Sequence, residues 1–229
     1  MDIGRSIQYV FEDPNWVKKM LIGGLLSLIP VFGTLIAAGY WIRIASNVAN
    51  NQELPLPEWN DFGGDFMRGL RAVVAVLIWA IPLIVFAACA IIPAAATGDS
   101  AAGALATLIT IGALTIAFIF WVAVAFISPV IIGRVSMSGS ISAAFEFREI
   151  LIDARENLVP LLITVAVAYA LGVVASFGVI LCLVGYLFTQ FLAYMMVSHL
   201  YGQIWRRLRL TPRHGTDLST GTISTDLGV

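Results

Sequence analysis

Residues 17–48 read VKKMLIGGLLSLIPVFGTLIAAGYWIRIASNV, an apolar run interrupted near its centre by Pro30 and Gly33. A single helix of these 32 residues would be about 48 Å long, against a hydrocarbon thickness of ~30 Å in a bilayer. Proline removes a hydrogen bond from a helix interior, and glycine tolerates the positive φ of a tight reversal. The run therefore predicts a helical hairpin with arms at residues 14–29 and 34–48. These arms either cross a thinned membrane or form a re-entrant loop.

The basic residues support this hairpin, because cytoplasmic loops of membrane proteins carry an excess of Lys and Arg. With a hairpin at residues 17–48, all 13 Lys and Arg residues fall on one side of the membrane, whereas a single crossing would divide them. We therefore expect a multi-pass protein of the cell (inner or plasma) membrane with its N and C termini in the cytoplasm.

The composition, with 59% hydrophobic and 12% charged residues and a mean hydropathy of +0.92, is that of a membrane protein. Further apolar runs at residues 68–93, 104–130, 158–178 and 185–205 are long enough to span a membrane. They predict an all-α fold: a polytopic transmembrane helical bundle of about six membrane segments in three helical hairpins. Residues 1–210 would form the membrane domain, and the polar residues 211–229 a flexible tail. The net charge of −1 gives no reason to expect nucleic-acid binding.

Two segments predict cytoplasmic amphipathic helices in the plane of the membrane, residues 2–13 and 138–157. In the second segment, acidic residues recur at steps of three and four and share one water-facing side of the helix: Glu146, Glu149, Asp153 and Glu156. This acidic stripe is either an ordinary solvated surface or a docking site for a partner protein.

Three polar residues in the predicted membrane segments form a candidate intramembrane site: Arg43, His199 and Gln190. Arg43 either belongs to an anion or proton site or extends toward the lipid headgroups, since no acidic residue lies inside a predicted span to pair with it. His199 either ligates a pigment or haem, or forms a hydrogen bond across helices.

The remaining candidates are small residues. Cys89 and Cys182 lie near the outer ends of their helices, which leaves open either a disulfide or two separate apolar residues. Ala168, Gly172 and Ser176, four residues apart, predict a close-packing face for another transmembrane helix. No sequence motif for a nucleophile, a phosphate-binding loop, zinc or a dinucleotide is present. We therefore expect a protein that is not an enzyme and that holds no cofactor or metal.

Four segments resemble a membrane protein family of bacteria and archaea, domain of unknown function number four thousand and thirteen. They are FEDPNWVKKMLIGGLLSLIPVFG, LPEWNDFGGDF, AAFEFREI with the REN that follows it, and HLYGQIWR. The resemblance covers about residues 7–207. It implies a polytopic membrane protein and carries no activity, ligand or catalytic residue.

Two functions are consistent with these features. The first is a non-catalytic scaffold or accessory subunit of a larger membrane complex, whose partners are membrane lipids and other integral membrane subunits or further copies of this chain. The alternative is a small-solute or ion transporter or channel that uses the broken first hairpin, because freed backbone groups at helix breaks can bind ions.

Overall fold

The computed structural model describes the backbone of residues 1–95 and 101–210, and the side chains of residues 1–88, 103–180 and 185–209. These residues form eight α-helices and two short 3-10 helices, with no strand among them, so the all-α prediction is confirmed. The helices are α1 (Ile3–Glu12), α2 (Trp16–Leu26), α3 (Phe32–Ala49), α4 (Phe62–Ala95), α5 (Ala101–Ser138), η1 (Ile141–Phe145), α6 (Phe147–Glu156), α7 (Leu158–Ser176), η2 (Phe177–Leu181) and α8 (Cys182–Leu210). The predicted tail, residues 211–229, and the side chains of Cys89 and Cys182 lie outside the described residues.

Three segments are long and apolar enough to cross a membrane: Phe62–Ala88, Gly103–Ser138 and Leu158–Ile180. No more than 33% of the residues in the most apolar part of each segment are buried inside the molecule. Large apolar side chains cover much of the outside, which indicates a membrane protein. The predicted arrangement of about six membrane segments is not confirmed, because α2, α3 and α8 are not among these three segments. Helix α2, at 11 residues, is only about 16 Å long.

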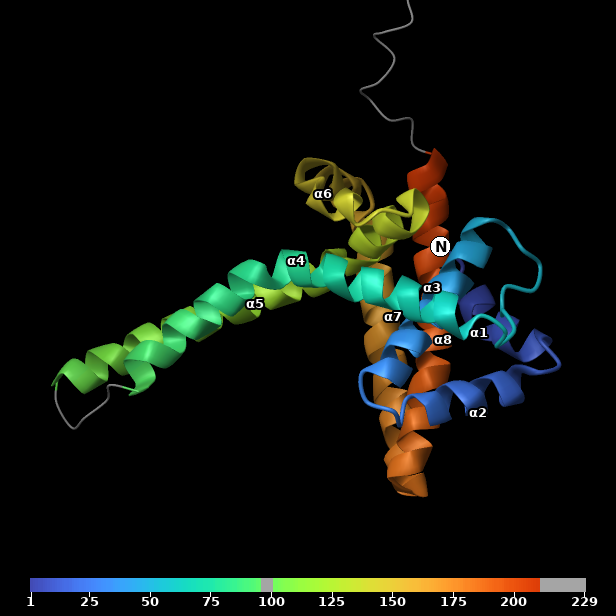
Figure 1. Ribbon diagram of the computed structural model, residues 1–229, viewed down its shortest axis with the longest axis horizontal. Helices are drawn as coiled ribbons and strands as arrows, with labels where there is room; N and C mark the ends of the chain where they lie inside the picture. The colour runs from blue at the N-terminus through green and yellow to red at the C-terminus, as the bar shows by residue number, and fades with distance from the viewer. Residues whose placement is uncertain (96–100, 211–229) are drawn as a thin grey trace, which may run out of the picture.

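The helices are arranged as two diverging hairpins (Figure 1). Helices α4 and α5 pack against each other as a long antiparallel arm, and α7 and α8 form a second hairpin that runs in another direction. Helix α3 lies beside α8 and crosses α4 near the start of the arm. The hairpins therefore meet at a common junction and splay apart, whereas the sequence predicts one helical bundle of three hairpins.

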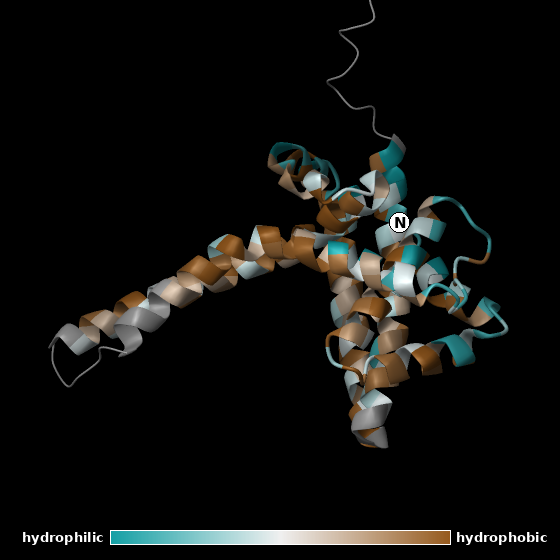
Figure 2. Cartoon of the chain, in the orientation of Figure 1, coloured by the Kyte–Doolittle hydropathy of each residue, from teal (hydrophilic) through white to brown (hydrophobic). Residues whose placement is uncertain are grey.

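Polar residues gather around this junction, whereas the arms are mostly apolar (Figure 2). The helices that meet at this junction bury two clusters of apolar residues. One centres on Ile131, Ile150 and Trp205, and the other on Tyr40 and Phe191. The core is thus at the point where the hairpins meet.

A proline inside α5 is part of the contact between the hairpins. Pro129 cannot donate to Ala125 O, and Ser128 Oγ donates to this carbonyl instead, at 2.8 Å. The Trp205 indole of α8 lies where a Cβ on Gly133 would sit, and its Nε1 donates to Pro129 O at 2.8 Å. These contacts attach α8 to the base of the α4–α5 arm.

The break in the first hairpin lies where Pro30 predicts it, but the positive φ is not at Gly33. Val31 has φ 65° and ψ −68°, and Phe32 N donates to Pro30 O at 2.8 Å, which is the geometry of a γ-turn. Gly33 lies inside α3, where a Cβ would be 1.8 Å from Leu26 O. The glycine is needed here because the end of α2 approaches it closely.

Candidate functional site

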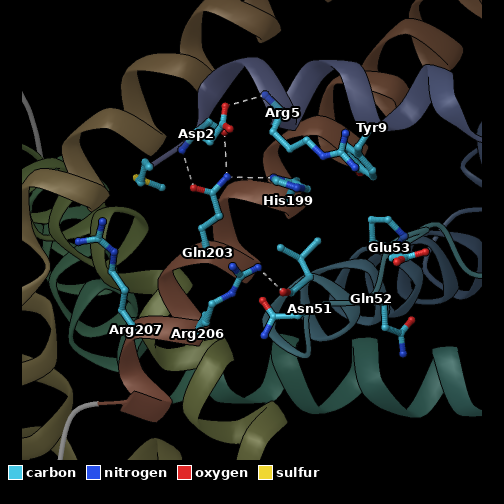
Figure 3. A pocket seen from close by; sticks show the side chains of 13 residues that line it. Asp2, Arg5, Tyr9, Asn51, Gln52, Glu53, His199, Gln203, Arg206 and Arg207 are labelled. Atoms are coloured by element: carbon cyan, nitrogen blue, oxygen red, sulfur yellow. Dashed lines mark hydrogen bonds between the residues drawn. The ribbon is translucent and has the colours of Figure 1, made fainter.

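A polar cleft with a volume of about 640 Å³ lies between α1, the start of the α3–α4 linker and the last turns of α8 (Figure 3). Its charged residues are three arginines and two acids: Arg5, Arg206, Arg207, Asp2 and Glu53. Arg5 comes from α1 and the other two arginines from α8, so they border the cleft from different elements.

The floor of the cleft is a hydrogen-bonded group of neutral side chains. Asp2 N donates to Gln203 Oε1 at 2.8 Å, which fixes the orientation of the amide. Gln203 Nε2 then donates to Asp2 O at 2.9 Å and lies 3.0 Å from His199 Nδ1. The Tyr9 ring packs on His199 with centroids 4.7 Å apart, and Tyr9 Oη donates to Met195 O at 2.5 Å. Burial raises the pKa of the Tyr9 phenol, which stays neutral.

This geometry does not favour His199 as a metal or haem ligand. A ligating histidine normally donates its second ring N–H to an acceptor, whereas His199 Nδ1 accepts from Gln203. The hydrogen bond between Gln203 and His199 also lies within α8. In place of the predicted hydrogen bond across helices, the His199 ring packs against the Tyr9 ring of α1.

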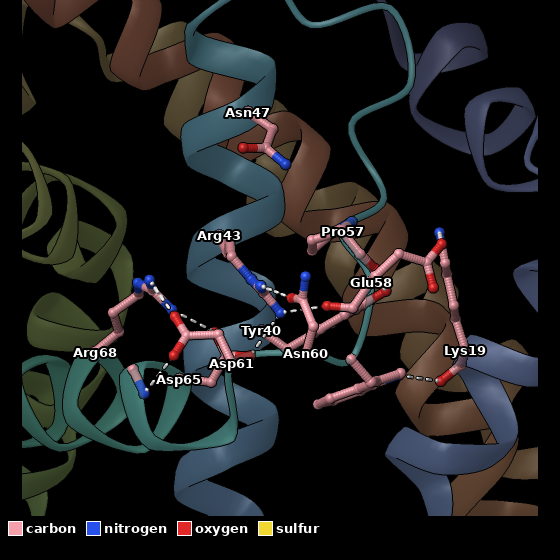
Figure 4. A network of polar contacts seen from close by, with 12 residues as sticks. Lys19, Tyr40, Arg43, Asn47, Pro57, Glu58, Asn60, Asp61, Asp65 and Arg68 are labelled. Carbon is pink, nitrogen blue, oxygen red and sulfur yellow. Dashed lines mark hydrogen bonds and ion pairs between the residues drawn. The ribbon is translucent and has the colours of Figure 1, made fainter.

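A second polar region holds the α3–α4 linker against α3 (Figure 4). Pro55 and Pro57 have no N–H and keep the segment extended, so its carbonyls need partners outside regular secondary structure. Tyr40, Arg43 and Asn47 lie on one side of α3 at steps of three and four. Four successive carbonyls each accept from a different side chain: Pro55 O from Asn47 Nδ2 (3.0 Å), Leu56 O from Lys19 Nζ (3.1 Å), Pro57 O from Tyr40 Oη (2.9 Å) and Glu58 O from Arg43 Nη2 (2.9 Å).

Arg43 also pairs with an acid that the sequence analysis overlooked. Asp65, in the first turn of α4, is 0% exposed. Its Oδ2 lies 2.7 Å from Arg43 Nη2, and its Oδ1 lies 2.7 Å from Arg68 Nη1. Arg68 in turn pairs with Asp61 at 2.8 Å. The expectation that Arg43 has no acidic partner within a span is therefore wrong.

Two glycines make this pairing possible by letting α3 and α4 touch backbone to backbone. A Cβ on Gly39 would lie 1.8 Å from Asp65 O, and a Cβ on Gly69 would lie 1.9 Å from Leu35 O. Any side chain at either position would force the helices apart. The close crossing thus determines the distance between Arg43 and Asp65.

Lys19 attaches α2 to the same linker. Its side chain is 3% exposed, and its Nζ lies 2.7 Å from both Asp13 Oδ2 and Glu58 Oε1. Trp59 Nε1 donates to Lys19 O at 3.0 Å, and the Trp59 ring stacks on the Tyr40 ring with centroids 4.0 Å apart. The described cations of this network are each matched by a carboxylate, so the network holds α2, the linker and α4 in place on α3.

The acidic stripe is also engaged within the chain. Arg134 of α5 lies 2.6 Å from Asp153, 2.5 Å from Glu146 and 3.9 Å from Glu149. Glu156 is exposed and makes no ion pair with a described residue. Glu146 and Glu149 are also exposed, and only Asp153 of the stripe is half-buried, so most of the stripe faces water while its ion pairs with Arg134 attach α6 to α5. The predicted single helix is also divided, into η1 and α6, at Glu146.

The structure separates the three residues of the candidate intramembrane site. Arg43 belongs to the linker network and His199 to the cleft, while Gln190 makes no hydrogen bond to the part of the chain that is described. A Cβ on Gly172 would meet nothing within 4 Å, so no helix among the described residues packs on this point of the small-residue stripe. Among the described side chains, no group of three or more His, Cys, Asp or Glu is placed to hold a metal ion.

Comparison with protein-family models gives a match over most of the chain. The family model described as "Protein of unknown function (DUF4013)" matches residues 22–184. The chain belongs to this family. The matched region contains Arg43, Asp65, Arg68 and Arg134, whereas much of the cleft, including Arg5, His199 and Arg206, lies outside it. No curated protein and no solved structure matches the chain.

Proposed function

We propose that this DUF4013 protein is a non-catalytic membrane scaffold or accessory subunit, and that its diverging hairpins bind transmembrane helices of other subunits or of another copy. The observation that carries this proposal is the splayed arrangement of Figure 1. Helices α4 and α5 pack on each other but leave large apolar residues exposed along the arm, for example Leu108, Phe118 and Trp121. Such faces provide room for van der Waals packing with a partner helix.

The charged residues support a structural role. Lys19, Arg43 and Arg134 are all occupied by carboxylates of the same chain. These pairs attach connecting segments to helices, which is what a rigid support for other subunits requires. In the proposed orientation the junction lies at the cytoplasmic surface of the cell membrane, with both termini on that side, and α2 is part of a re-entrant hairpin.

One observation favours a transporter as the second candidate. Asp65 is a fully buried carboxylate within a segment long enough to span the membrane, and ionisable residues at such positions often lie on substrate or proton pathways. Ion and solute flux into liposomes tests this candidate. Arg43→Gln should abolish flux if the pair acts in transport, whereas a structural pair should alter only stability.

Site-specific photocrosslinking in native membranes tests the scaffold proposal. A photoreactive residue at Phe118, whose side chain is 62% exposed, should give a discrete crosslinked protein band. The same residue at the buried Ala117 is the matched control and should crosslink only within the chain. Crosslinks from Phe118, Leu108 and Trp121 to lipid alone would overturn the proposal.

A further inference from the structure

We propose that the cleft between α1, the linker and α8 is a binding site for a phosphate-bearing anion, either a lipid headgroup or a soluble phosphate. This site is distinct from the apolar surfaces of the proposed scaffold role. Its three arginines are the residue type best suited to phosphate, because the planar guanidinium donates two parallel hydrogen bonds to phosphate oxygens.

Arg206 is the residue that is best placed for this role. Its Nη2 donates to Val48 O at 2.7 Å, which fixes the guanidinium in the wall of the cleft. Its buried Nε has no hydrogen-bond partner among the described residues, and none of their carboxylates lies within ion-pair distance of its side chain. A partly buried cation without a counter-charge is costly, and a bound anion would offset that cost.

Of the two acidic residues of the cleft, Glu53 is exposed to solvent, which screens its charge, and Asp2 is already engaged within the chain. Asp2 Oδ1 accepts from Arg5 N at 2.8 Å as the N-cap of α1, so its charge is already stabilised by the start of that helix. Arg5 pairs with Glu12 at 2.5 Å, but this pair is largely exposed, and an exposed pair is worth little. Arg5 can therefore change partners at small cost.

Helix α1 places the cleft at the membrane boundary. It has three sides: one is buried against the protein, one exposes apolar residues and one is polar. The residues are Ser6, Tyr9 and Val10 on the first side, Ile3, Ile7 and Phe11 on the second, and Arg5, Gln8 and Glu12 on the third. With the apolar side in lipid, Arg5 and the cleft face the headgroup region and the water beyond it. Both sources of phosphate are accessible at that depth.

The test measures the thermal unfolding midpoint of the full-length purified protein. Inorganic phosphate is titrated against chloride at equal ionic strength, and nanodiscs containing phosphatidic acid are compared with nanodiscs of phosphatidylcholine. A ligand that binds the folded state raises the midpoint, and the rise grows with the logarithm of the ratio of ligand concentration to Kd. A rise with inorganic phosphate identifies a soluble phosphate site, and a rise only with phosphatidic acid identifies a lipid headgroup site.

The variants separate a specific site from general attraction to basic residues. Arg5→Gln and Arg206→Gln should each weaken binding about tenfold, whereas Arg148→Gln, at an exposed arginine on α6, should leave it unchanged. Glu12→Gln releases Arg5 and should strengthen binding several-fold, which a merely structural role would not produce. The Arg5 side chain is 44% exposed, so its variant remains informative if Arg206→Gln fails to fold. Absence of a rise with either ligand, or an equal loss in Arg148→Gln, would overturn the proposal.

Discussion

The pair formed by Arg43 and Asp65 allows a quantitative test of how α3 and α4 are held together. Asp65 is completely buried, and the Arg43 side chain is only 15% exposed, with 2.7 Å between Nη2 and Oδ2. Replacing Asp65 with Asn keeps the shape of the side chain and removes its charge. Arg43 and Arg68 would then lie on either side of a neutral amide, with no carboxylate between them.

The expected loss follows from the geometry. Two unit charges about 4 Å apart attract each other by about 4 kcal/mol at an effective dielectric constant of about 20. Part of this lost attraction is offset in the variant, because the neutral amide of Asn is less costly to bury than the carboxylate of Asp. Removing one partner of a buried pair typically costs about 3–5 kcal/mol. We expect Asp65→Asn to lower the free energy of unfolding by about 3 kcal/mol, near the lower limit of that range.

A double-mutant cycle isolates the pair from the rest of the network. Arg43→Gln leaves Asp65 paired with Arg68, so it should cost less, about 2 kcal/mol. The double variant leaves no unpaired charge from this pair, so its loss should fall short of the sum by about 1–3 kcal/mol. Reversible unfolding in mixed micelles of detergent and dodecyl sulfate measures all four proteins, with Arg148→Gln as the control. Strict additivity would refute the reasoning.

Three further perturbations probe the helix contacts. Gly39→Ala should lower the free energy of unfolding by about 2–3 kcal/mol, because the added methyl group overlaps the backbone of α4. Gly172→Ala has open space around it and should raise the free energy of unfolding by about 0.5–1 kcal/mol. The same unfolding assay compares the two variants, and equal effects would contradict the close crossing of α3 and α4. Val31→Gly should raise the free energy of unfolding by about 1 kcal/mol by relieving the positive φ, and a loss of stability would contradict the γ-turn. Arg134→Gln should release α6 from α5, so amide hydrogens of residues 147–156 should exchange faster than in the unmodified protein. Unchanged protection of these amides would show that the ion pairs do not hold α6.

The elements that depend on local pattern could be predicted from the sequence. The long apolar runs give α4, α5 and α7, because about 20 consecutive apolar residues have few other stable conformations in a membrane protein. Pro30 correctly gives the position of the first break. The positive φ could not be assigned, because Val31 is a residue for which sequence rules give that conformation a high cost.

The candidate sites were harder to predict, because they depend on contacts between distant segments. The sequence does not give the partner of Arg43 directly, because Asp65 precedes the apolar run at residues 68–93, whereas the helix that contains this run begins at Phe62. A charge inside an apolar helix requires a counter-charge. The acidic residue nearest to the next span, Asp65, was the feature of the sequence that could have identified the partner of Arg43. The acidic stripe was identified by its periodicity, but its orientation depends on Arg134, which lies 19 residues before Asp153. Periodicity shows which residues share one side of a helix and does not show which residues of other helices contact that side.

The two polar regions have different relations to the family. The linker network, apart from Asp13 and Lys19, lies within the matched residues 22–184, and it joins α3 to α4 through side chains of those residues. The cleft draws Arg5 from before that region and Arg206 from after it. A scaffold built on the α3–α4 crossing would therefore use the part of the chain that defines the family. A phosphate site in the cleft depends on how the two flanking segments, α1 and the end of α8, pack together, so Arg5→Gln should weaken binding without disturbing the crossing.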